Sequence, residues 1–187
     1  QCPGRQRQEQ WQRSTPAPQT GPEQLMSSIA WVGLGSNLDN PLQQLHLALE
    51  ALHQLPETTL ADASPVYRSH PVGPSDQPDF LNMAARLETE LPATTLLQQL
   101  LAIEDAQGRV RTQVWGPRVL DLDLLLYGLD TIAQPELSVP HPELPNRDFV
   151  LRPLLDLDPD LALPDGRRID DLLRACPDNG LTPVTLA

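Results

Sequence analysis

Two carboxylates and three arginines lie within 15 residues of one another. Asp121 and Asp123 are separated by a single residue, and they follow Arg109, Arg111 and Arg118. Side chains two apart on a strand project from the same face with Cα atoms about 7 Å apart, so the two carboxylates can share one or two divalent cations. Oxygen ligands favour magnesium. Because such a cation bridges phosphate oxygens while guanidinium groups neutralise the remaining charge, the segment predicts a polyphosphate site.

Each feature also has a plainer interpretation. The two aspartates could solvate the outer face of a half-buried strand, and Arg109 and Arg111 could form surface ion pairs with Glu104 and Asp105. All 13 basic residues are arginine, a bias that suits phosphate recognition but that a GC-rich genome would also produce. The absence of lysine excludes a P-loop lysine and a Schiff-base lysine.

Length and composition restrict the class of protein. The chain has 187 residues, 40% of them hydrophobic, and a net charge of −12, as expected of one acidic globular domain. The acidic balance argues against duplex nucleic acid as a partner. No apolar run approaches the roughly 20 residues that a membrane span needs, and no secretory signal is recognisable. Cys2 and Cys176 fit neither zinc nor disulfide spacing, so we expect a cytoplasmic protein.

Residues 1–25 differ in composition from the rest. They are rich in Gln and Pro and show no helical or strand period, so we expect either a disordered tail or a remnant of upstream read-through. Met26 then opens a well-patterned segment and is the expected natural start. We therefore expect a single domain over residues 26–187.

Hydrophobic periodicity predicts the elements that must position the charged segment. Strands are expected at residues 29–34, 60–68 (interrupted by Pro65), 80–90 and 119–127, and helices after Pro41, after Pro92, near 149–155 and near 169–175. The order strand, helix, strand, strand, helix, strand indicates a ferredoxin-like α+β sandwich, with a mostly antiparallel sheet, helices packed on it and an open face.

The strand at 119–127 orients the candidate site. Its leucines at 120, 122, 124 and 126 are expected to share one face because strand side chains alternate. Asp121 and Asp123 must then lie on the opposite face, toward a cleft.

Four segments, in chain order, resemble the 6-hydroxymethyl-7,8-dihydropterin pyrophosphokinase family of folate biosynthesis. The resemblance covers about residues 29–165, and its most specific part is W-G-P-R-V-L-D-L-D at 115–123. The segments that carry it are 35–38, 72–82, 109–123, and 139–142 with Asn146 and Arg147. This family transfers the β,γ-pyrophosphoryl unit of ATP to the hydroxymethyl group of the reduced pterin and releases AMP.

The resemblance implies a role for each matching residue of the charged half. Asp121 and Asp123 would bind two Mg²⁺ ions, and Arg109 and Arg118 would hold the phosphates during transfer; these four are the expected catalytic residues. Arg111 would lie in a loop that closes over ATP. The remaining expected ATP-binding residues are Glu104, Trp115, Leu124, Ser138, His141 and Arg147.

By the same resemblance, the pterin would stack between Phe80 and Phe149. Asn82 and backbone groups near Ser69, His70 and Val72 would read its hydrogen-bonding edge. These are the only two phenylalanines in the chain. Aromatic faces match a flat heterocycle, although ordinary core packing is the plainer explanation for each Phe.

The chain also departs from the family pattern. The loop between Arg111 and Trp115 is one residue shorter than in well-known members. Glu136 stands where an arginine can occur near the nucleotide, and Pro142 stands where some members have an aromatic residue. Either replacement could weaken ATP binding without altering the chemistry, and no general base is assigned.

Two other functions compete with this interpretation. A nucleotide-sugar glycosyltransferase also uses D-x-D to hold a metal against a diphosphate, but the chain lacks an α/β nucleotide-binding unit. A ferredoxin-like regulatory module would bind a small ligand on its sheet and would release no AMP. The expected partners are therefore ATP and the pterin, with no nucleic acid or membrane, and the protein is expected to be a monomer.

Overall fold

A six-stranded antiparallel sheet forms the centre of the protein, in a computed structural model that describes residues 27–72, 76–108 and 117–185. The strand order is β5-β1-β4-β3-β8, and β2 also pairs with β4. The elements in chain order are β1 (Ser28–Ser36), α1 (Pro41–His53), β2 (Thr58–Ala63), β3 (Tyr67–Ser69), β4 (Phe80–Thr89), α2 (Ala93–Ala106), β5 (Asp121–Tyr127), β6 (Ile132–Ala133), β7 (Ser138–Val139), a 3₁₀ turn (Leu144–Asn146), α3 (Asp148–Leu157), α4 (Ile169–Ala175) and β8 (Thr182–Pro183).

Strand β1 lies between the two longest partners. It pairs with β4 from Ser28↔Thr89 to Ser36↔Leu81, and with β5 so that Gly35 lies opposite Asp121 and Gly33 opposite Asp123. With β2 and β3 beyond β4, the arrangement is the ferredoxin-like sandwich that the element order predicts.

The strand expected at 60–68 is divided in two at Pro65. Strand β2 ends at Ala63 and β3 begins at Tyr67, and both pair with β4. Proline has no N–H to donate to the ladder, which explains the break between the two short strands.

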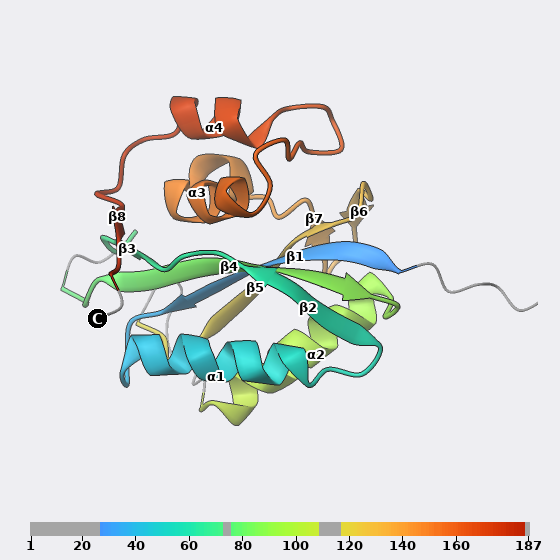
Figure 1. The fold of residues 1–187 in the computed structure, drawn as a ribbon, viewed down its shortest axis with the longest axis horizontal. Helices are drawn as coiled ribbons and strands as arrows, with labels where there is room; N and C mark the ends of the chain where they lie inside the picture. The colour runs from blue at the N-terminus through green and yellow to red at the C-terminus, as the bar shows by residue number, and fades with distance from the viewer. Residues whose placement is uncertain (1–26, 73–75, 109–116, 186–187) are drawn as a thin grey trace, which may run out of the picture.

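Helices cover both faces of the sheet, unequally. Helices α1 and α2 lie side by side on one face (Figure 1), where Leu45, Leu52, Leu96 and Leu100 are fully buried in the larger core. Helices α3 and α4 lie on the other face and enclose a second, smaller core. The face of the sheet that was expected to be open is therefore partly covered. The candidate site lies on the part of this face that α3 and α4 do not cover.

One residue of β5 departs from the expected alternation. Leu120, Leu122 and Leu124 join the core under α1 and α2 as predicted, but Leu126 belongs to the core under α3 and α4. The β1–β5 register shifts here, since Trp31 is opposite Leu126 while Val32 is opposite Leu124. The bulge inserts one extra residue and reverses the side chains beyond it, so the prediction for Leu126 was wrong.

Within the described residues, no helix is long and apolar enough to cross a membrane. The short strands β6, β7 and β8 were not predicted. Strand β8 is the outermost strand and pairs with β3, so the C-terminal segment runs back along the sheet to the side away from β5.

Candidate active site

Strand β5 presents two carboxylates from the face that α3 covers only in part. Asp121 and Asp123 lie opposite Gly35 and Gly33 of β1. A Cβ atom on Gly35 would lie 3.3 Å from Asn82 Oδ1, tighter than most side chains tolerate. The two glycines therefore keep the neighbouring strand bare beside the carboxylates, as the close approach of polar groups requires.

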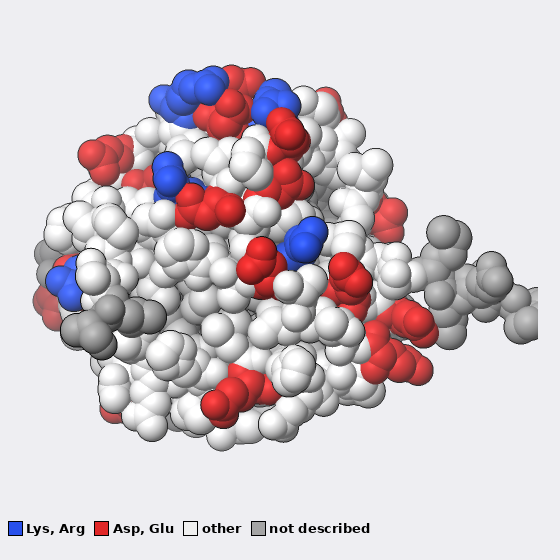
Figure 2. All heavy atoms as spheres, viewed as in Figure 1, with Lys and Arg blue, Asp and Glu red and all other residues white. Residues whose placement is uncertain are grey.

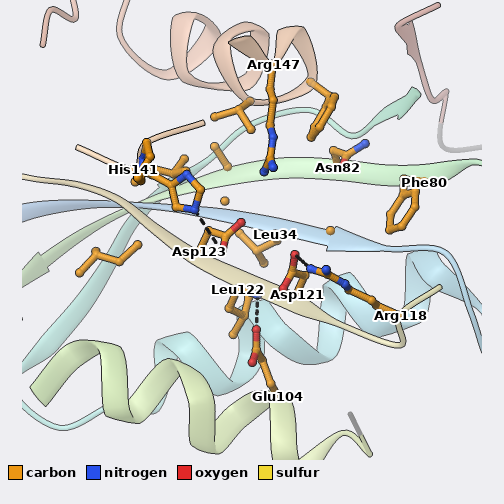
Figure 3. Close-up of a pocket in the computed structure, with 18 of the residues that line it drawn as sticks. Leu34, Phe80, Asn82, Glu104, Arg118, Asp121, Leu122, Asp123, His141 and Arg147 are labelled. Carbon is orange, nitrogen blue, oxygen red and sulfur yellow. Dashed lines mark hydrogen bonds and ion pairs between the residues drawn. The ribbon is translucent and has the colours of Figure 1, made fainter. Parts of the chain in front are cut away.

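Basic side chains converge on these two aspartates (Figure 3). Arg118 Nη1 lies 2.5 Å from Asp121 Oδ2, and His141 Nε2 lies 3.8 Å from Asp123 Oδ1. Burial raises the pKa of Asp123, and the negative charge of Asp121 raises it further, against the opposing charges of His141, Arg147 and Arg118. The two carboxylates thus repel each other in a partly desolvated position, and a divalent cation bound between them would relieve that repulsion.

The two carboxylates fit magnesium, which also binds water and phosphate, better than they fit a metal ion whose ligands all come from the protein. Among the described residues, no group of three or more His, Cys, Asp or Glu could enclose a metal ion. Magnesium dehydrates reluctantly and is bound by one or two carboxylates together with water and substrate phosphates. Asp121 and Asp123 match that requirement, because both are oxygen donors and both line a cavity.

A buried glutamate supports β5 from the helix side. Glu104, on α2, is 1% exposed, and its Oε1 accepts a hydrogen bond from the Leu122 N–H at 2.7 Å (Figure 3). Leu122 stands between the two aspartates, so this bond holds the backbone that orients them. A carboxylate acceptor makes such a bond stronger than a neutral one.

Asn37 joins two segments beside the site. Its Oδ1 accepts a hydrogen bond from the Arg118 N–H at 2.8 Å, and its own N–H donates to the Arg118 carbonyl at 3.1 Å. Its Nδ2 donates to the Pro78 carbonyl at 3.0 Å, and the side chain is buried. The sequence analysis assigned no role to this residue. Its signal is a side-chain amide directly after a strand, since an amide can donate to one backbone group and accept from another.

The opposite end of the site is aromatic. Phe80, Phe149 and Asn82 all line the cavity, and Asn82 donates from Nδ2 to Ser69 Oγ at 2.9 Å. The Arg147 guanidinium carbon lies 5.9 Å from the centroid of the Phe149 ring, a cation–π distance. Arg147 therefore lies where the charged and aromatic ends meet.

One cavity of about 500 Å³ contains both ends, within the size range of small-molecule sites. Every predicted site residue that the structure describes lines it: Ser69, His70, Val72, Phe80, Asn82, Glu104, Arg118, Asp121, Asp123, Leu124, Ser138, His141, Arg147 and Phe149. Glu136 and Pro142 also line it. The predicted residues Arg109, Arg111 and Trp115 lie outside the described residues.

Charges over α4 are balanced locally. Over α4, blue and red side chains interleave (Figure 2), and Arg174 pairs with Asp170 and Asp171 at 2.7 Å. Arg168 pairs with Asp160 and Asp170 at 3.3 Å. Exposed pairs of this kind contribute little to stability. They leave these arginines engaged with their own neighbours on the surface, away from the cavity.

Fold and site together define a ferredoxin-like α+β protein whose sheet carries one cavity with a charged end and an aromatic end. The family model for 7,8-dihydro-6-hydroxymethylpterin-pyrophosphokinase (HPPK) matches residues 31–159. The chain belongs to this family. It is 54% identical over 156 residues to a 2-amino-4-hydroxy-6-hydroxymethyldihydropteridine pyrophosphokinase of Pseudomonas aeruginosa, covering 83% of this chain and 96% of that protein.

Other relatives agree. A pyrophosphokinase of the same name from Haemophilus influenzae is 47% identical over 150 residues, which cover 80% of this chain and 94% of the relative. Among solved structures, a Plasmodium falciparum HPPK-DHPS triple mutant superposes with a TM-score of 0.66 at 15% identity, covering 82% of this chain. The chain spans 45% of the length of that structure, and at this identity the likeness concerns the fold.

Proposed function

We propose that the chain transfers the β,γ-pyrophosphoryl unit of ATP to the hydroxymethyl group of 6-hydroxymethyl-7,8-dihydropterin and releases AMP. Membership of the HPPK family supports this reaction. The observation that carries it is the single cavity, lined at one end by Asp121, Asp123 and Arg118 and at the other by Phe80 and Phe149. A charged substrate and a flat aromatic substrate can therefore bind side by side in this cavity.

The charged end would bind the triphosphate. Asp121 and Asp123 would hold two Mg²⁺ ions, Arg118 would contact the phosphates, and His141 and Arg147 would bind on the nucleotide side. When bound, magnesium would supply a positive charge against the developing charge on the phosphate oxygens. Leu124 would contact the adenine through its backbone, with Ser138 and Glu104 completing the pocket.

Three residues outside the described part of the chain belong to the same proposal. Arg109 would hold the phosphates together with Arg118, while Arg111 and Trp115 would contribute to ATP binding. Glu136 and Pro142 line the cavity in place of an arginine and an aromatic residue found in some members, so ATP affinity would be lower than in those members.

The aromatic end would bind the pterin. Phe80 and Phe149 would cover its two faces, and Asn82 would pair with its edge, because a side-chain amide both donates and accepts. The hydrogen bond from Asn82 Nδ2 to Ser69 Oγ fixes the orientation of that amide before substrate arrives. Backbone groups near Ser69, His70 and Val72 would complete recognition of the ring.

The reaction requires positioning more than covalent chemistry. The hydroxymethyl oxygen would attack the β-phosphorus, the bond from that phosphorus to the α,β-bridging oxygen would break, and AMP would leave with the bridging oxygen. The hydroxyl proton would pass to solvent. The protein would contribute alignment of the two substrates and charge stabilisation by Arg118 and Arg147.

The direct test is to incubate the protein with ATP, Mg²⁺ and 6-hydroxymethyl-7,8-dihydropterin and to separate the nucleotides by chromatography. AMP and the pterin diphosphate should appear in equal amounts, and omission of the pterin should abolish AMP formation. ADP as the product would indicate transfer of a single phosphoryl group, and no turnover would favour the regulatory module. Cytoplasmic location, a monomeric state and the domain boundary near residue 25 stay predictions.

A further inference from the structure

Asn179, in the C-terminal segment, forms hydrogen bonds with residues on two sides of the aromatic end. Asn179, between α4 and β8, donates from its backbone N–H to Asp148 Oδ2 at 2.8 Å and from its side-chain Nδ2 to Asp148 Oδ1 at 2.9 Å. Its carbonyl accepts a hydrogen bond from the His70 N–H at 3.3 Å. Asp148 begins α3, and His70 follows β3. Asn179 therefore connects these two elements from outside the cavity.

The Asp148 carboxylate directly controls the start of α3. It is buried, and besides the two bonds from Asn179 its Oδ1 accepts one from the Phe149 N–H at 2.8 Å. A buried carboxylate requires such donors, and a negative charge in the first turn of a helix is favourable. Asn179 supplies two of these three donors. The backbone that carries the Phe149 ring is thus held to the C-terminal segment.

The same segment packs against the opposite wall. Gly180 has φ of 70°, and a Cβ atom there would lie 2.7 Å from Cδ2 of the His70 ring, so the ring rests against a bare backbone. Strand β8 then pairs with β3, with Thr182 opposite Arg68. Strand β3 and His70, which follows it, are consequently attached to residues 179–183.

We propose that Asn179 and Asp148 are positioning residues for the ring substrate: together they set the separation between Phe149 and His70, which both line the cavity. Neither residue lines the cavity, so neither touches substrate. This inference rests on the proposed function, because it takes the aromatic end as the pterin end. Strands β5 and β8 lie at opposite ends of the sheet order, so the effect falls more on the pterin than on the phosphate-binding groups that β5 carries.

Calorimetry with each ligand separately tests the inference. Asn179→Ala should raise the Kd for the pterin about tenfold, the loss expected for a hydrogen bond to a charged group, while the Kd for a non-hydrolysable ATP analogue with Mg²⁺ should change less than about twofold. In turnover, KM for the pterin should rise more than kcat falls.

A side-chain exchange provides the rescue. Asn179→Asp places two carboxylates together and should weaken pterin binding more than Asn179→Ala does. Combining Asp148→Asn with Asn179→Asp restores one amide and one carboxylate in contact, so pterin affinity should recover toward the wild-type value. A structural role without positioning would lower thermal stability and the affinities for the pterin and for the ATP analogue together, whereas positioning changes pterin affinity alone.

Tyr67→Phe is the matched control. The Tyr67 hydroxyl donates to Asp156 Oδ2 at 2.5 Å and also ties β3 to α3, but away from the cavity, so this variant should lose thermal stability and keep its pterin affinity. If Asn179→Ala bound the pterin as tightly as wild type does, the positioning inference would be wrong but the proposed function would stand. A wild-type protein that binds no pterin would overturn the proposed function and the inference with it.

Discussion

Asn37 and Arg118 exchange two hydrogen bonds, although they are far apart in the sequence. The Arg118 N–H donates to the Asn37 side chain at 2.8 Å, and the Asn37 N–H donates to the Arg118 carbonyl at 3.1 Å. The Arg118 side chain in turn contacts Asp121 at 2.5 Å. The end of β1 therefore fixes the backbone of an arginine that lines the charged end of the cavity.

Asn37→Ala should impair catalysis more than folding. Loss of the buried amide should cost about 1–3 kcal/mol of unfolding free energy, and release of the Arg118 backbone should lower kcat/KM about 10²-fold, the usual effect of a misplaced catalytic group. Urea unfolding and steady-state kinetics measure the two effects. Asn40→Gly is the control, since Asn40 is exposed with φ of 62° and a glycine accepts that conformation. Equal turnover in Asn37→Ala and wild type would contradict the role given to this contact.

Asp121→Asn and Asp123→Asn should each abolish Mg²⁺-dependent turnover while leaving the fold intact. Loss of one charge-stabilising group at a reacting centre costs about 10²–10³ in kcat. Titration with Mg²⁺ and the ATP analogue should show weakened metal binding, and EDTA should abolish turnover of the wild type. Circular dichroism checks the fold, and Asp130→Asn, in an exposed turn, serves as the matched control. Full activity in either variant would exclude the metal role.

The raised pKa of Asp123 makes a prediction about stability. The folded protein holds this proton more tightly than the unfolded chain, whose carboxyl has the ordinary value of 3.8. The stabilising contribution is therefore fully present below pH 3.8 and is lost as the pH rises through the raised folded pKa. Without metal, Asp123→Asn should melt at a higher temperature than wild type at pH 7, and the difference should shrink toward pH 4. Thermal melts in EDTA across this range measure it, and a variant less stable than wild type at pH 7 would contradict the sign.

Phe80→Ala and Phe149→Ala should each weaken pterin binding by about 1–3 kcal/mol, the range for losing one stacking face. Affinity for the ATP analogue should change little. Phe→Leu at each position separates stacking from packing, because leucine keeps apolar volume but has no aromatic face. Calorimetry with each ligand measures the effect. If a variant lost affinity for the ATP analogue but kept its pterin affinity, the assignment of the aromatic end to the pterin would be wrong.

Much of the fold was predictable because its signals are local. Alternation along β4 and the three- and four-residue spacing of leucines in α1 each depend on neighbouring residues, and α4 begins and ends where the sequence predicts. The bulge that turns Leu126 to the other core was not predictable, because a shift of register is a property of two paired strands. Strand β8 was not predicted either, because a strand of two residues is too short to show a hydrophobic period.

The sequence by itself determined which groups could perform chemistry: the carboxylate pair of β5, its spacing on one strand face, and a supply of arginine and phenylalanine that matches the family pattern. Only the tertiary structure decided what holds those groups in place. Asn37 against Arg118, Glu104 against Leu122 and Asn179 against Asp148 are each contacts between distant segments. No local pattern encodes them, because a hydrogen bond of this kind exists only after the hydrophobic packing of the sheet and its helices has brought its donor and acceptor together.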